Sequence, residues 1–251
     1  MCGARVGIRA AAILLAMWIF PLVAAAVAGV FAALLVRQYL QRRRSYQLLW
    51  AIALLMYAVA SLAVSIGALS GWSRLSFEVY WVFGAVLNVP FLAAGELQLL
   101  IRNRTVAVAI DVLLVFLTAY AISVTRGALY DAQALTQQLP SGKHVFGDGS
   151  AAHQLPQLIS IPSYLILVIG ALWSAWRMRG RPELKDRFMG TLLIVLGATV
   201  IAGFGSAFAA LGDLAPFSIA LLVGISVMFW GFLRASKPVS VPAAETATDA
   251  R

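Results

Sequence analysis

Two carboxyl groups, those of Glu96 and Asp111, lie inside long apolar stretches of the sequence. An ionisable side chain at membrane depth is costly, so each is a functional candidate. Glu96 lies six residues before Arg102 and Asp111 lies seven after Arg104, which places each about 10 Å inside the same boundary if both stretches are helical. Because the connection is short, the two helices must form an antiparallel hairpin with the carboxyl groups at similar depth.

This carboxyl pair has two interpretations. If the two groups face one another, like-charge repulsion and loss of water would let the pair share a proton or hold a cation. Alternatively, each carboxylate pairs with a basic residue of a nearby loop, or bonds Ser, Thr or Tyr on another helix, and only orders the helices.

The helix that carries Glu96 holds three further candidates. Glu78 comes 18 residues earlier, five turns of an ideal helix, which predicts that both glutamates share one face at opposite ends. Asn88 and Pro90 interrupt the apolar run near its middle, where proline frees a backbone carbonyl for polar neighbours. A kink beside Asn88 could line a binding cavity; alternatively, Asn88 hydrogen-bonds across a helix interface.

The one long polar segment, residues 126–155, contains both histidines. His144, Asp148 and His153 have side chains that suit zinc, but their spacing follows no known metal motif, and we predict no metal. We expect the segment to cap the helices or contact a partner. Four side chains could dock it onto the helices: Leu129, Tyr130, Val145 and Phe146.

The composition identifies the class of protein that must position these residues. Of 251 residues, 62% are hydrophobic and 12% charged, whereas a soluble domain is roughly half apolar and a quarter charged. The single cysteine excludes an intramolecular disulfide, and the apolar segments contain no histidine for haem or copper. Because P-loop, nucleophile-elbow and zinc-protease motifs are also absent, we predict no cofactor and no catalytic activity.

Seven apolar runs predict an all-α, polytopic membrane domain of seven transmembrane helices over residues 1–235. The predicted helices are residues 10–36, 46–70, 76–101, 105–124, 156–176, 188–211 and 214–234. Residues 236–251 are rich in Pro and polar residues and predict a disordered cytoplasmic tail.

The positive charges predict the orientation of these helices. Fourteen of the 19 Lys and Arg residues follow the first, third, fifth and seventh apolar runs. The positive-inside rule therefore places the N-terminus outside, the C-terminus in the cytoplasm and residues 126–155 in an outer loop. The net charge of +9 then reflects topology, and no nucleic-acid partner is expected. Alternatively, Arg5, Arg9 and the first apolar run form a cleaved signal peptide, although that run continues to Arg37.

Internal spacing predicts how the helices pack. Small residues recur every four positions in the first and sixth helices, which allows close approach: Ala25, Gly29 and Ala33, then Ala202, Ser206 and Ala210. The first three and the last three helices share one layout, which predicts a three-plus-one-plus-three repeat about the fourth.

Four features of the sequence resemble an uncharacterised family of seven-helix membrane proteins from high-GC, actinobacterial-type bacteria. They are Gly71-Trp72, the runs Gly84 to Gly95 and Leu139 to Gly147, and the arginine-rich loop before the sixth helix. The resemblance implies a multi-pass protein of the bacterial plasma (inner) membrane and brings no activity with it. More distantly, the layout is similar to the seven-helix input modules of some sensor kinases, although this sequence contains no kinase domain.

Together these features predict a non-catalytic, sensor-like protein or accessory subunit. We expect it to bind a partner or small ligand within the lipid bilayer, in a membrane-protein complex or a homo-oligomer. The alternative is a small carrier or proton-coupled transporter that uses the intramembrane carboxylates.

Overall fold

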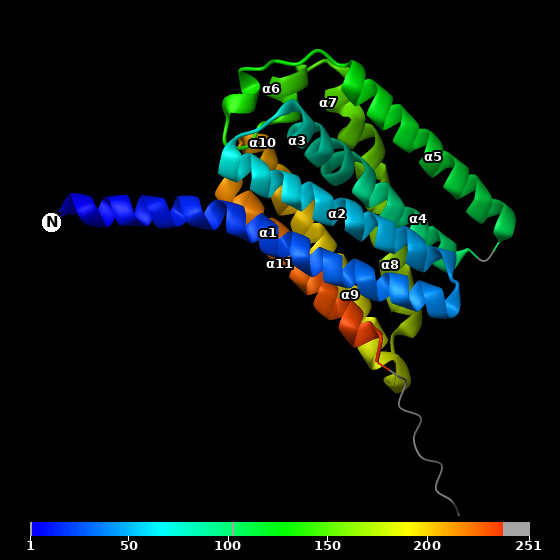
Figure 1. Ribbon diagram of the computed structural model, residues 1–251. Coiled ribbons are helices and arrows are strands. Elements are labelled where there is room, and N and C mark those ends of the chain that lie inside the picture. Colours follow the sequence, from blue (N-terminus) through cyan, green and yellow to red (C-terminus); the bar gives the residue numbers. More distant parts are fainter. Residues whose placement is uncertain (1, 102, 238–251) are drawn as a thin grey trace, which may run out of the picture.

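The computed structural model describes residues 2–101 and 103–237, with side chains described from Met17 onward (Figure 1). Arg102 and the predicted tail from residue 238 lie outside the described residues. Seven helical spans are long and apolar enough to cross a membrane, and the described residues contain no strand. The predicted all-α, seven-helix fold class is therefore confirmed, and the chain is a multi-pass membrane protein.

Four spans are continuous α-helices, whereas the other three consist of shorter helices joined to a 3₁₀ or π segment. The first, second, fourth and seventh spans belong to α1 (Cys2–Arg42), α2 (Ser45–Ser70), α5 (Arg104–Gly127) and α11 (Leu214–Ala235). The third comprises α3 (Arg74–Val79), the π-helix η1 (Tyr80–Leu87) and α4 (Asn88–Leu100). The fifth comprises α7 (Ala151–Leu155), the π-helix η3 (Pro156–Ser160) and α8 (Ile161–Met178). The sixth comprises η4 (Pro182–Leu184), α9 (Lys185–Thr199), the π-helix η5 (Val200–Gly205) and α10 (Ser206–Leu211).

Six of the seven spans form a closed ring. Around it, α1 packs against α2, α2 against α4, α4 against α8, α8 against α9, α9 against α11, and α11 against α1. The fourth span, α5, lies outside the ring and contacts α4, η1 and α7 (Figure 1). The two sets of three helices that predicted a repeat are therefore the two halves of the ring.

The first span packs through a stripe of small residues one position away from the predicted stripe. Ala24, Ala28 and Ala32 are fully buried, whereas in the predicted stripe Ala25 is buried, Gly29 is partly exposed and Ala33 is exposed. The predicted four-residue spacing is present, but the register is wrong. Two adjacent stripes of small apolar residues look alike in sequence, and only contact with the neighbouring helices distinguishes them.

Glycine brings the backbones of α9 and α11 into contact at two levels. Gly190 lies against Gly231, and a Cβ built on Gly190 would be 2.5 Å from the Gly231 carbonyl oxygen. Gly197 lies against Gly224 in the same way, one heptad along each helix. Such close approach provides van der Waals packing, which is the main attraction between helices in lipid.

The stripe predicted in the sixth helix is not this packing surface. Ser206 and Ala210 are exposed, and a Cβ on Gly203 would meet no atom within 4 Å. The π-helix η5 lies between the two regions and changes the number of residues per turn, so a face extrapolated from ideal helical spacing is lost there.

Aromatic side chains fill the ring at the end where residues 128–150 lie. Phe77 is fully buried and contacts Trp81 and Phe146, with ring centroids 5.8 and 5.6 Å away. Two indole N–H groups bind backbone above this cluster: Trp72 donates to the Gln138 carbonyl of the polar segment at 2.9 Å, and Trp81 donates to the Ala152 carbonyl in the first turn of the fifth span at 3.1 Å.

The polar segment is thus a folded cap that contains η2 (Ala134–Thr136) and α6 (Gly142–Phe146). Val145 and Phe146 are buried as the docking interpretation requires, whereas Leu129 is 90% exposed and does not dock. The fifth span begins at Ala151, five residues before its predicted start, because Ser150 caps it by accepting a hydrogen bond from the His153 N–H.

The glycine contact between α9 and α11 predicts a selective loss of stability. Gly197→Ala should lower the free energy of unfolding by about 1–3 kcal/mol, because the new methyl group would overlap the Gly224 carbonyl and Met228. SDS-induced unfolding of the purified protein measures this change. Gly203→Ala is the control; it should be neutral or stabilise by up to about 1 kcal/mol. Equal effects of the two substitutions would contradict the interpretation.

Candidate functional site

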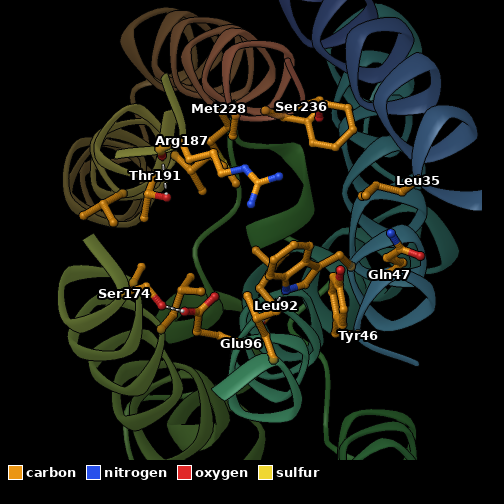
Figure 2. A pocket seen from close by; sticks show the side chains of 18 of the residues that line it. Leu35, Tyr46, Gln47, Leu92, Glu96, Ser174, Arg187, Thr191, Met228 and Ser236 are labelled. Atoms are coloured by element: carbon orange, nitrogen blue, oxygen red, sulfur yellow. Dashed lines mark hydrogen bonds between the residues drawn. The ribbon is translucent and has the colours of Figure 1, made fainter. Parts of the chain in front are cut away.

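The ring of six helices encloses a cavity of about 650 Å³ at the end opposite the aromatic cluster (Figure 2). Every helix of the ring contributes to its wall, by residues that include Leu35, Trp50, Leu92, Leu167, Ile194 and Met228. The cluster of Phe77, Trp81 and Phe146 does not line it, and neither does the cap. This cavity therefore lies at the end of the bundle that carries the arginine-rich connections.

Basic side chains surround the mouth of the cavity. Arg42 at the end of α1, Arg177 near the end of α8, Arg187 near the start of α9 and Lys237 after α11 all line it and are exposed. The Arg187 side chain extends into the cavity (Figure 2). Nothing in the spacing of these residues along the sequence shows that they converge on one cavity.

Glu96 lies in the wall of the cavity, below this basic mouth. Its side chain comes from α4, and the residue is only 5% exposed. Its Oε1 accepts a hydrogen bond from the Ser174 hydroxyl of α8 at 3.4 Å, and Gly170 leaves room for the glutamate side chain. Among the described residues, no cation lies within ion-pair distance of Glu96. One long hydrogen bond leaves most of its bonding capacity available to a ligand.

Asp111 does not join Glu96. The Gln98 side-chain amide donates to Asp111 Oδ1 at 2.8 Å, on the side of α4 that faces α5. Helical residues are about 100° apart, so Gln98 and Glu96 project from nearly opposite sides of α4. The structure thus gives each carboxyl group its own polar partner on another helix, and Asp111 lies on the exposed α5, outside the cavity.

Two glutamines that were not predicted as site residues, Gln38 and Gln47, also line the cavity. Gln47 of α2 is 2% exposed and lines the cavity, where its amide donates to Gln38 of α1 at 3.3 Å. Its Oε1 accepts no hydrogen bond from any described residue. A buried amide oxygen without a donor is costly. The sequence offered one signal, since Gln47 stands at the start of a helix among otherwise apolar buried positions.

Asn88 and Pro90 lie about two helical turns before Glu96 in the third span, and they do not line the cavity. The Asn88 amide donates to the Ala53 carbonyl of α2 at 3.3 Å, which is the interface role weighed above. Because Pro90 has no backbone N–H, it cannot donate a hydrogen bond to the Val86 carbonyl, four residues earlier, or to the Ala85 carbonyl, five residues earlier. The Ser160 hydroxyl lies 2.9 Å from the Val86 oxygen and 2.7 Å from that of Ala85, so it supplies the missing donor.

Glu78 belongs to a separate ionic cluster at the cap. It pairs with Arg74 at 2.9 Å and with Arg126 at 3.7 Å, and it accepts a hydrogen bond from the Tyr130 hydroxyl at 3.2 Å. Burial raises the pKa of the Tyr130 hydroxyl, and the nearby negative charge of Glu78 raises it further. The hydroxyl therefore stays protonated and can donate the hydrogen bond to Glu78. Glu78 and Glu96 do not share a face, because the π-helix η1 between them shifts the helical register.

The two histidines of the cap do not form one site. His144 Nδ1 lies 3.0 Å from the Ser141 hydroxyl, whereas His153 lies 3.8 Å from Asp148, which also pairs with Lys143 at 3.0 Å. Within the described part of the chain, no group of three His, Cys, Asp or Glu side chains could hold a metal ion.

In comparisons with models of protein families, curated proteins and solved structures, nothing matched this chain. The fold and the cavity therefore carry the functional argument alone.

The Ser160 hydroxyl bonds carbonyls to which Pro90 cannot donate, and we therefore predict that Ser160 stabilises the third span. Ser160→Ala should cost about 1–3 kcal/mol in SDS-induced unfolding, because the Ala85 and Val86 carbonyls lose the one hydroxyl hydrogen that they share. Ser163→Ala, three residues on, is the control: that hydroxyl only bonds the Ile159 carbonyl of its own helix, and its loss should cost roughly 0.5 kcal/mol or less. The interpretation fails if the control is as damaging.

The cavity predicts that a thiol at position 174 reacts with a small reagent. In a Cys2→Ser background, Ser174→Cys should react with methyl methanethiosulfonate, and adding Ile194→Trp should slow the reaction at least about tenfold by filling the cavity. Leu196→Trp is the matched control, because Leu196 is 53% exposed and lies outside the cavity. Mass spectrometry of quenched samples measures the rates. Equal slowing by the two tryptophans would show that the introduced thiol is not reached through the cavity.

Proposed function

We propose that this protein is a non-catalytic, sensor-like or accessory protein that binds a small ligand in the cavity of the ring. The cavity itself is the observation that supports this proposal. Its volume of about 650 Å³ lies within the range of small-molecule sites, roughly 300–1,000 Å³. Its wall is mainly apolar, with a few polar groups such as Glu96, Ser174 and Gln47, and this is the pattern by which such sites combine affinity with orientation.

The proposal includes a location and an orientation. The positive-inside rule favours a cytoplasmic position for the basic mouth and an outer position for the cap, in a bacterial plasma membrane. A ligand would then enter from the cytoplasm or the inner leaflet. The largely exposed, apolar α5 offers a surface to lipid or to a neighbouring subunit, consistent with an accessory role in a complex.

A proton-coupled carrier is the alternative function, and Glu96 is the observation that favours it. A buried carboxyl group in a cavity at membrane depth can exchange a proton as a substrate binds. Asp111 would take no part, because it lies outside the cavity. A carrier must also open the opposite end of the ring, which the packed aromatic cluster and the cap close in this structure.

Sidedness of access separates these two functions. With Ser174→Cys in a Cys2→Ser background, the binding proposal predicts that an impermeant methanethiosulfonate reacts from the cytoplasmic side only, in inverted but not in right-side-out vesicles. A thiol introduced by Lys143→Cys in the exposed cap should show the reverse pattern and calibrates the vesicles. Reaction at position 174 from both sides would favour the carrier. Reaction from the outer side only would overturn the proposed orientation.

A further inference from the structure

Three arginines at the cavity mouth have no acidic partner among the described residues. Arg42, Arg177 and Arg187 come from α1, α8 and α9, and none takes part in an ion pair there. By contrast, Arg234 at the end of α11 pairs with Asp186 at 2.9 Å and does not line the cavity. The cavity has a single carboxyl group, that of Glu96, against four basic side chains. Its mouth therefore carries net positive charge.

Along the cavity wall, the residues of these three helices change from basic to polar to apolar in the same order from the mouth inward. One turn inside the arginines, the lining residues are hydrogen-bonding: Gln38 in α1, Ser174 in α8 and Thr191 in α9. One turn further in, they are apolar: Leu35, Ala171 and Ile194. Side chains three or four residues apart lie on one face of a helix, so each helix presents a basic, then a polar, then an apolar position to the cavity. The interior beyond is apolar on every side.

This gradient is complementary to an amphipathic anion. We propose that the cavity binds a carboxylate or phosphate headgroup at Arg42, Arg177 and Arg187, with the attached hydrocarbon chain in the apolar interior. The inference rests on the proposed binding function and names its ligand class. Guanidinium groups bind carboxylate and phosphate oxygens through paired hydrogen bonds, and basic pockets between membrane helices at the cytoplasmic side bind anionic headgroups.

Glu96 fits this arrangement as a positioning residue. It lies inward of the arginines, in the polar layer with Ser174. A negative charge there would repel an anion that moved deeper, and its free lone pairs could accept a hydrogen bond from a hydroxyl or amide next to the headgroup. The unpartnered Gln47 oxygen offers a second acceptor in the wall.

The test uses three probes with the same chain and different charge. In phosphatidylcholine nanodiscs, dodecyl phosphate should protect the thiol introduced by Ser174→Cys from the neutral reagent methyl methanethiosulfonate. Dodecanol should protect less, and dodecyltrimethylammonium least. Nanodiscs that contain phosphatidylglycerol identify the source of the headgroup. Protection by that lipid alone indicates a membrane phospholipid, whereas protection only after dodecyl phosphate is added indicates a free amphiphile; both outcomes support the proposed chemistry.

Arginine variants connect this protection to the mouth. Arg177→Gln and Arg187→Gln should each weaken protection by dodecyl phosphate about tenfold or more, because each removes a charged hydrogen-bond donor. Arg179→Gln removes the same charge from the same connection, outside the cavity, and should change the affinity less than twofold. Arg187→Lys keeps the charge without the planar guanidinium and should give an intermediate loss, which preserves the test if a glutamine variant fails to fold.

Two results would overturn the inference. One is equal protection by all three probes, and the other is an equal loss of affinity in Arg179→Gln and Arg187→Gln. In either case, if the thiol introduced by Ser174→Cys still reacts from the cytoplasmic side, the proposed binding function stands and the ligand has a different chemistry. If Ile194→Trp does not slow the reaction, there is no accessible cavity and the proposed function itself fails.

Discussion

Close backbone contact between neighbouring helices holds the ring together. Lipid is as apolar as leucine, so membrane helices gain little by hiding apolar side chains from it and associate where their backbones can approach. Here the glycines of α9 and α11 and the alanine stripe of α1 provide that approach. Once six helices close into a ring in this way, its interior must be filled by side chains or left hollow.

The interior of the ring is filled by side chains at one end and contains a cavity at the other. At the cap, Phe77, Trp81 and Phe146 are large enough to fill the interior, and two indole N–H groups bind backbone above them. At the other end, the side chains of the ring leave a cavity with an apolar interior and a basic mouth. One architecture therefore combines a packed, closed end with a hollow, basic end, and this asymmetry underlies both proposals.

The third span shows how helix irregularity selects which polar groups reach the cavity. The π-helix η1 and Pro90 divide it into two segments with different registers. Glu78 then faces the ionic cluster at the cap, Asn88 faces α2, and Glu96 faces the cavity. In this irregular stretch the Ser160 hydroxyl lies within hydrogen-bond distance of the Ala85 and Val86 carbonyls and supplies a donor that Pro90 lacks. A regular helix would have placed both glutamates on one face.

The class of protein and the number of spans can be predicted from the order of the residues alone, because burial in lipid requires long apolar helices whatever their arrangement. The sequence also identifies Glu96 as a costly residue at membrane depth, since its neighbours along the chain are apolar. Three features emerge only in the folded protein: Glu96 and Asp111 are separated, α1 packs one residue out of the predicted register, and Arg42, Arg177 and Arg187 converge on one cavity. Those outcomes depend on the rotation of each helix about its axis. Side-chain contacts and π-helical turns fix that rotation, and neither appears in the hydrophobic pattern.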